Sequence, residues 1–231
     1  GGRRRMTLAV VEGQPDIRFG LYLRPPLAMS RAQAEIHDIV ARQYGTMCAG
    51  RFMPHATIKG FFRSDASVDE MVAALDPVMT RHEPFDIRNR GIIPFGKSGG
   101  PVLDIQHLED GSTNTALQAF HEDVFTALAP LVRADCDFTP VEGAMERFHA
   151  HLTLAMGDIP KGLTDELLAF LRDAEPIGPD AFTADRFHLV ACRSRQWSGS
   201  WWESMQWTLL HSWQLGGEGA RVQSPTWNVP R

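Results

Sequence analysis

Two histidine–threonine pairs are the residues of this sequence whose types and spacing best suit chemistry. His55 precedes Thr57 by two residues, and His151 precedes Thr153 by two residues, each pair within an apolar run. On a β-strand alternate side chains share a face, so each histidine lies beside its threonine while the apolar residues turn the other way. One such pair is a weak signal, but one in each half of the chain predicts two strands that face a common substrate.

An imidazole on each side of a phosphate suits acid–base cleavage of a phosphodiester. One histidine takes a proton from the nucleophile and the other gives a proton to the leaving oxygen, and both can do so near neutral pH. The hydroxyls of Thr57 and Thr153 can donate hydrogen bonds to the non-bridging oxygens. Lys59 follows His55 by four residues, so on a regular strand it shares that face and adds a cation. We therefore predict that His55, His151 and both threonines are catalytic, and that Lys59 binds substrate.

An aromatic stretch near the C-terminus predicts a second substrate contact. Trp197 and Trp201 lie in a glycine-containing loop that Arg193 and Arg195 flank. Exposed indoles beside arginines can stack a nucleobase and hold its phosphate. These four residues are predicted to bind substrate, and packing inside the fold is the alternative for the two tryptophans.

Two alternatives to metal-independent catalysis follow from the same residues. His149 and His151 form an HxH pair on one strand face, which suits a metal-dependent hydrolase because imidazoles bind zinc. Neither motif strand carries a nearby carboxylate, however, and the threonines would then have no role, so we predict no metal and no cofactor. A non-catalytic module that binds nucleotides or RNA remains open, since residue types alone do not establish turnover.

The composition is that of an ordinary globular chain. Hydrophobic residues make up 43% and charged residues 22% of the 231 residues, which is enough for one bilobed domain. No apolar run approaches the ~20 residues of a membrane helix and no signal peptide is visible, so we expect a cytoplasmic protein without membrane contact, and a monomer. A net charge of −5 disfavours a sequence-independent grip on long nucleic acid. Three cysteines without CxxC spacing indicate buried thiols, at Cys48, Cys136 and Cys192.

Periodicity and capping signals predict the elements around the motifs. Ser30 is the expected N-cap of a helix that ends at Gly45, and Ser67 with Glu70 forms a capping box before a second helix. His121, beside the apolar stripe of a later helix, is expected at the surface. Further helices are predicted at 112–133 and 160–174, a hairpin loop at 96–100, and strands at 17–24, 56–62, 85–95, 102–108, 182–192 and 205–215.

The order helix, motif strand, helix, strand, strand occurs in each half of the chain. It predicts an α+β, bilobed fold, with two pseudo-symmetric lobes of mainly antiparallel sheet backed by helices and an active-site cleft between them. We assign 6–215 to one domain, with lobes around 45–108 and 135–215 on which 17–44 and 112–133 pack. We expect residues 1–5 to be a tag or disordered, and 216–231 to form a C-terminal tail.

The two motifs resemble the pair of His-x-Thr-x sequences that defines the 2H phosphoesterase superfamily, which includes the bacterial 2′-5′ RNA ligase-like proteins and cyclic phosphodiesterases. Residues 54–61, PHATIKGF, are very similar to its first motif, and 17–22 are similar to its opening strand. Many RNA ligase-like members have an arginine two residues after the second motif, where this chain has Met156.

The resemblance implies the bilobed 2H fold, with His55 and His151 as acid and base and the two threonines as phosphate contacts. It implies a metal-independent phosphodiesterase that acts on a nucleotide or short RNA, at a 2′,3′-cyclic phosphate or a 2′-5′ linkage. Which histidine is the acid, and which of these substrates is used, stay open at the level of the sequence.

Overall fold

The computed structural model describes residues 16–136, 144–216 and 220–221. Its helices are α1 (Leu27–Tyr44), α2 (Val68–Arg81), α3 (Thr115–Leu128), α4 (Ala144–Arg147) and α5 (Thr164–Asp173), with short 3-10 turns η1 (Ala49–Arg51), η2 (Ala129–Leu131) and η4 (Trp201–Glu203). Its strands are β1 (Ile17–Leu23), β2 (Ala56–Phe62), β3 (Phe85–Arg88), β4 (Ile92–Phe95), β5 (Gly100–Asp104), β6 (His151–Thr153), β7 (Ala181–Ala184), β8 (Arg186–Arg193), β9 (Gln206–Gln214) and β10 (Ala220–Arg221).

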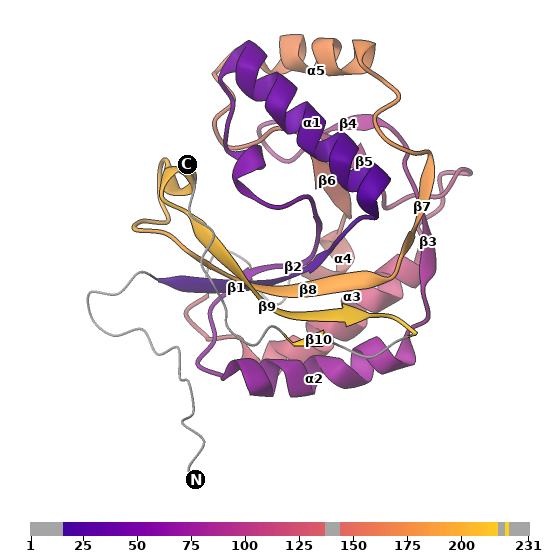
Figure 1. The fold of residues 1–231 in the computed structure, drawn as a ribbon, viewed down its shortest axis with the longest axis vertical. Helices are drawn as coiled ribbons and strands as arrows, with labels where there is room; N and C mark the ends of the chain where they lie inside the picture. The colour runs from indigo at the N-terminus through magenta and orange to yellow at the C-terminus, as the bar shows by residue number, and fades with distance from the viewer. Residues whose placement is uncertain (1–15, 137–143, 217–219, 222–231) are drawn as a thin grey trace.

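One antiparallel sheet of eight strands forms the centre of the molecule, in the order β10-β9-β8-β1-β2-β6-β5-β4. Strands β3 and β7 form a separate antiparallel pair. Helices α2 and α3 cover one face of the β1–β8–β9 part, and α1 lies on the other side of these strands (Figure 1). The predicted α+β class, with a mainly antiparallel sheet backed by helices, is confirmed.

The two motif strands are direct neighbours at the centre of this sheet. Ala56 of β2 lies opposite Leu152 of β6 in an antiparallel pair, so the register sets His55 opposite Thr153, and Thr57 opposite His151. Side chains directly opposite one another on such a pair share a face and lie about 5 Å apart. The sheet therefore gathers both motifs on one face.

Strands are exchanged between the two halves of the chain. β5, which precedes the second motif, pairs with β6 and carries β4 at its other edge, whereas β8, which follows the second motif, pairs with β1 and with β9. A division of the chain into 45–108 and 135–215 does not describe this pairing, because β4 and β5 lie on the side of the second motif strand and β8 and β9 on the side of the first. Of the predicted C-terminal tail, β10 pairs with β9 as an edge strand, and residues 1–5 lie outside the described residues.

Several predicted element boundaries change for local reasons. The N-cap of α1 is Pro26, and the Ser30 hydroxyl, expected as the cap, donates instead to the Pro25 carbonyl from inside the first turn. Proline suits a helix start, where its missing N–H is not needed. The end of α1 at Gly45, with φ +73°, and the capping box of α2 are confirmed.

Two long predicted strands are each divided. Segment 85–95 splits into β3 and β4 because Gly91, with φ +83°, turns the chain between them, a conformation glycine adopts easily. Segment 182–192 splits at Asp185 into β7 and β8, so β3 and β7 leave the large sheet and pair with each other. The strand predicted at 102–108 ends at Asp104, and α4 lies in the predicted loop at 135–147.

The apolar core lies between the sheet and its helices, and α1, α2, α3 and α5 all contribute buried side chains to it. Its largest fully buried side chains include Phe19, Phe62, Phe120 and Phe187. All three cysteines are buried, as predicted. No helix among the described residues is long and apolar enough to cross a membrane.

Candidate active site

The two motif histidines are held by the same local hydrogen bond. The Nδ1 atom of His55 lies 2.7 Å from the carbonyl oxygen of Met53, and that of His151 lies 2.7 Å from the carbonyl oxygen of His149. A carbonyl can only accept, so each Nδ1 carries the proton and donates it. Each Nε2 is therefore an acceptor when the ring is neutral and a donor when the ring is protonated, as an acid–base pair requires.

The expected alternation of faces holds along both motifs. Ala56 and Leu152 are fully buried, while the flanking histidines and threonines are partly exposed. Among the described residues neither Thr57 nor Thr153 has a side-chain hydrogen bond. Two hydroxyls and two imidazoles thus share one sheet face, where the hydroxyls can bind a ligand.

Helix α1 joins the two motifs through a buried amide that the sequence did not reveal. The Gln33 side chain accepts from the backbone N–H of His55 at 3.1 Å and donates to the carbonyl of Thr153 at 3.0 Å. His37, one turn later, lies with Nε2 2.8 Å from the same carbonyl. Gln33 is fully buried, so these bonds fix one end of each motif relative to the other. Their i, i+4 spacing on the helix was the only signal in the sequence.

Lys59 does not share the face of His55, and that expectation is wrong. A register shift in the β1–β2 pair sets Tyr22 opposite Thr57 but Leu21 opposite Lys59, so Ile58 is the extra residue of a bulge. A bulge of one residue turns the following side chain to the other face. Lys59 is 3% exposed, and its Nζ lies over the rings of Phe62 and Phe125 on the helix side.

His121 supports this bulge from α3. Its Nδ1 lies 2.7 Å from the carbonyl oxygen of Ile58, and its ring stacks on Phe148 with centroids 3.7 Å apart. The side chain is 2% exposed, so the prediction of a surface histidine is wrong. The buried face of α3 therefore includes His121 as well as the apolar residues. A polar side chain can be buried when it is hydrogen-bonded, as this imidazole is.

An aromatic cluster of Phe52, Phe61, Trp197 and Trp201 borders His55. Trp197 stacks on Trp201 with centroids 5.5 Å apart, Phe61 contacts both indoles, and Phe52 lies 6.0 Å from Trp201. Phe52 also lies 5.4 Å from the His55 ring. The structure thus brings the predicted tryptophan loop next to the first motif.

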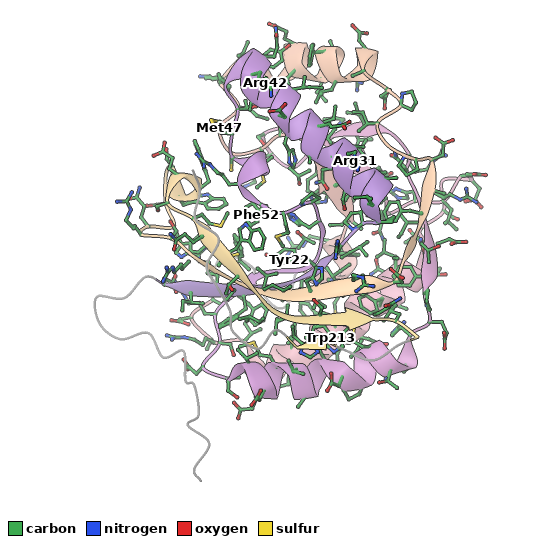
Figure 2. All side chains as sticks on the ribbon, viewed as in Figure 1. Tyr22, Arg31, Arg42, Met47, Phe52 and Trp213 are labelled. Carbon is green, nitrogen blue, oxygen red and sulfur yellow. The ribbon has the colours of Figure 1, made fainter. Side chains whose placement is uncertain are left out.

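The aromatic cluster is fixed from both ends of β1. The Tyr22 ring lies 4.9 Å from the His55 ring. The phenol of Tyr22 packs against the backbone of Gly20, where any larger residue would clash with it. The Arg18 guanidinium lies 4.2 Å from the centre of the Trp197 ring, whose Nε1 donates to the Asp16 carbonyl. Tyr22 and Phe52 lie close together on the side of the strands that faces α1, whereas Trp213 lies on the side of α2 (Figure 2).

Arg193 and Arg195 are less directly connected to the motifs. Arg193, at the end of β8, donates to the side chain of Gln206 on β9 at 2.8 Å. Arg195 is exposed in the loop that follows, where its backbone N–H donates to Ser204. Arg18, which the sequence did not single out, stacks on the aromatic cluster.

The side chain of His149 contacts a carboxylate, whereas only its backbone carbonyl contacts His151. The Nε2 atom of His149 lies 3.0 Å from Asp104 Oδ1, while His107 Nδ1 lies 2.8 Å from Asp104 Oδ2. Among the described residues these three form the group with metal-ligand geometry, and His151 is not part of it. The geometry therefore does not favour His149 and His151 as a metal pair.

Similarity to known proteins agrees with the fold. The model of the 2′-5′ RNA ligase superfamily matches residues 27–195. The chain belongs to this superfamily. Membership confirms the resemblance to the 2H phosphoesterases that the motifs indicated, and it supports an enzyme of the phosphoesterase type. A search of the curated proteins finds no match to the sequence.

Solved structures with the same fold share little sequence with this family member. Apo LigT from E. coli is 17% identical, with a TM-score of 0.51 over 88% of this chain and 99% of that one. TT0787 from Thermus thermophilus is 17% identical, with a TM-score of 0.50 over 87% and 99%. A further phosphoesterase is 18% identical, with a TM-score of 0.50 over 87% and 99%. At such identities the likeness shows the common fold.

The position where many RNA ligase-like members have arginine is apolar here and lies beside the motifs. Met156 is partly buried and packs against the cluster that contains Tyr22 and Phe52. Two residues later, the Asp158 carboxylate accepts from the backbone N–H of Cys48 at 3.1 Å. The loop after the second motif thus packs against the segment before the first motif. At the position of the family's arginine it places the apolar side chain of Met156 beside the motifs.

Burial makes both motif histidines harder to protonate. Loss of solvent lowers the pKa of His55 to about 4, although its hydrogen bond to the Met53 carbonyl acts in the opposite direction. Burial also lowers the pKa of His151; the nearby His149 imidazole adds to this shift, whereas the hydrogen bond to the His149 carbonyl and the Asp104 carboxylate oppose it. The carboxylate makes the two sites unequal, since it favours the protonated form of His151.

Proposed function

We propose that this protein is a metal-independent phosphodiesterase that acts on a nucleotide or on the end of a short RNA, at a 2′,3′-cyclic phosphate or a 2′-5′ linkage. The observation that carries the proposal is the mirrored pair of imidazoles, each with Nδ1 held by a carbonyl and each next to a threonine hydroxyl that has no partner among the described residues. Membership of the 2′-5′ RNA ligase superfamily supports the same class of reaction.

The histidine pair can carry a complete hydrolysis of a cyclic phosphate. The neutral imidazole takes a proton from water through Nε2 as the water oxygen bonds to phosphorus. The bond from phosphorus to one ribose oxygen breaks, and the protonated imidazole gives that oxygen a proton, which leaves a phosphomonoester and a free hydroxyl. Thr57 and Thr153 donate hydrogen bonds to the non-bridging oxygens, where negative charge increases in the transition state.

The unequal surroundings of the histidines assign their roles in the free enzyme. His55, with its pKa lowered to about 4, is the residue that is neutral and ready to accept a proton. The pKa of His151 is also lowered by burial, but the Asp104 carboxylate favours its protonated form, a contribution that His55 does not have. We therefore assign His55 as the base and His151 as the acid in hydrolysis.

The aromatic cluster supports a nucleotide as the substrate. Trp197 and Trp201 are partly exposed and border His55 through Phe52, where a nucleobase attached to the reacting phosphate would lie. Stacking on aromatic side chains accepts every base, because each has a π-face. The related fold of E. coli LigT has been solved with 3′-AMP and with NADP+, which supports a nucleotide ligand here.

A panel of substrates tests the proposal. The purified protein is incubated with 2′,3′-cyclic nucleotides and with 2′-5′-linked and 3′-5′-linked oligonucleotides, with and without EDTA. We expect turnover of at least one 2′,3′-cyclic or 2′-5′ substrate, at a rate that EDTA does not change. Binding of these nucleotides without any cleavage would identify a binding module. Activity lost on chelation and restored by zinc or manganese would identify a metal-dependent hydrolase.

A further inference from the structure

A second cluster of ionisable side chains lies where β5 ends and β6 begins. Asp104 is the last residue of β5, His107 follows three residues later, and His149 stands two residues before β6. The Asp104 carboxylate lies 2.8 Å from His107 Nδ1 and 3.0 Å from His149 Nε2. One possible ligand atom from each of the three side chains lies within 4.8 Å of the other two.

We propose that Asp104, His107 and His149 bind a divalent transition-metal ion of the zinc type. Two imidazoles and a carboxylate are ligands that zinc prefers, and its bonds to them are about 2.0–2.2 Å long. Tetrahedral ligands at that radius lie about 3.3 Å apart. The distances of 3.0 Å from His149 to Asp104 Oδ1 and 2.8 Å from His107 to Asp104 Oδ2 are close to that value, so an ion can enter once the shared protons leave and the side chains adjust.

The electrostatics of Asp104 favour a cation at this place. The residue is 7% exposed, and a buried carboxylate is costly unless a charge or several hydrogen bonds compensate it. Within the described residues its ion-pair partners are the two histidines, with no lysine or arginine. When both imidazoles are neutral the cluster carries one net negative charge, which a bound divalent ion more than balances.

The cluster is held in place before any ion arrives. Asp104 Oδ1 accepts from the backbone N–H of Gln106 at 2.9 Å, and the Asp104 backbone N–H donates to the Gly91 carbonyl. The His149 ring packs against Phe95, with centroids 5.5 Å apart. The His107 and His149 side chains are 34% and 27% exposed, which leaves one side open for entry of the ion and for bound water.

The proposed ion would lie beside the catalytic pair without taking part in it. His151 is outside the ligand group, and its Nδ1 is bound to the carbonyl of His149, so its Nε2 stays available for proton transfer. His149 would bind the ion through its side chain, whereas it holds His151 through its backbone carbonyl, so the two roles use different atoms of His149. The proposal concerns a structural ion and goes beyond the proposed phosphodiesterase reaction.

Metal titration of the full chain tests the site. Protein stripped with chelator and dialysed is titrated with zinc by calorimetry, and with cobalt while the visible absorption of Co²⁺ is recorded. We expect one saturable site per chain and a cobalt spectrum typical of nitrogen and oxygen ligands. Asp104→Asn and His107→Ala should each weaken zinc binding by more than about 10-fold, the smallest loss seen when only a supporting partner of a ligand is removed.

A second histidine–carboxylate pair provides the matched control. His82 Nε2 lies 2.7 Å from Asp123 but has no second histidine beside that carboxylate among the described residues, so His82→Ala should bind zinc like the wild type. Unchanged affinity in folded His107→Ala, or no saturable zinc binding by the wild type, would overturn the proposal. Neither readout depends on turnover, so an inactive chain that binds zinc would refute the proposed reaction and leave this site intact.

Discussion

At the scale of single residues, the mirrored surroundings of His55 and His151 explain how two ordinary imidazoles become an acid–base pair. Both Nδ1 atoms donate hydrogen bonds to backbone carbonyls, so Nε2 is the atom of each ring that can transfer a proton. The spacing of histidine and threonine predicted which side chains share a face, because strand alternation is a local property. It did not predict which imidazole holds its proton more firmly, since that depends on Asp104 from a strand distant in sequence.

The pH dependence of kcat/KM should reflect this inequality. Below about pH 4 His55 becomes protonated and no longer accepts a proton, and above the lowered pKa of His151 that residue no longer has one to give. We expect a bell-shaped profile with its maximum on the acid side of about 6.5, the unperturbed pKa of histidine. Initial rates at constant ionic strength measure it, and a flat profile or a maximum above about pH 7 would contradict the assignment.

Substitution of Trp201 tests the aromatic cluster as a base-stacking surface. Trp201→Ala should raise KM by roughly 5–150-fold with little change in kcat, because stacking is worth about 1–3 kcal/mol and is common to ground and transition states. A minimal phosphodiester without a base should show no such change. Equal impairment on both substrates, or a large fall in Tm, would instead place Trp201 in the core of the fold.

At the scale of elements, the sequence did not predict the bulge in β2 or the pairing of strands from the two halves of the chain. Periodicity located β2 to the residue and predicted α2 with its capping box, since both signals are local. It placed Lys59 on the wrong face because the shift depends on the pairing with β1 and on the bond from His121 to Ile58. Gln33 was missed for a similar reason, because its partners are backbone groups far along the chain.

Gln33 should act as a positioning residue whose loss affects catalysis more than stability alone explains. Gln33→Met keeps the size but removes the bonds to His55 and Thr153, which should lower stability by about 1–3 kcal/mol and lower kcat as the motifs lose their fixed spacing. Asn89→Leu is the control, because Asn89 also joins backbone segments but lies between β3 and β4. If both variants lose equal stability and equal kcat, Gln33 has only a structural role.

At the scale of the whole molecule, one sheet carries both the core and the site, so histidines that serve different purposes are buried together. His188 on β8 lies opposite Tyr22 on β1, is 9% exposed, and is bonded to the hydroxyl of Ser212. Burial, then the nearby Arg24 and Arg186, lower its pKa to about 4. The pKa values of His37, His55 and His151 are lowered as well.

Stability should therefore fall as the solution becomes acidic. Between about pH 4 and 6.5 His188 is protonated in the unfolded chain but neutral in the folded protein. The free energy of unfolding therefore rises with pH through this window and decreases as the pH falls. One such histidine lowers the free energy of unfolding by about 2 kcal/mol when the pH falls from about 7 to 5. Urea unfolding at the two pH values should show that His188→Asn reduces the loss by about this amount; an unchanged loss would contradict the shift.

The measurement that tests the central claim most directly is kcat/KM for His55→Ala, His151→Ala and the double variant, on the substrate that the wild type cleaves fastest. Each single substitution removes one proton-transfer partner and should lower kcat/KM by roughly 10²–10⁴-fold with the fold intact. The double variant should be little worse than either one, because the residues act as a unit. His82→Ala is the control and should match the wild type. Near wild-type turnover in either folded single variant would contradict two-histidine catalysis at this site.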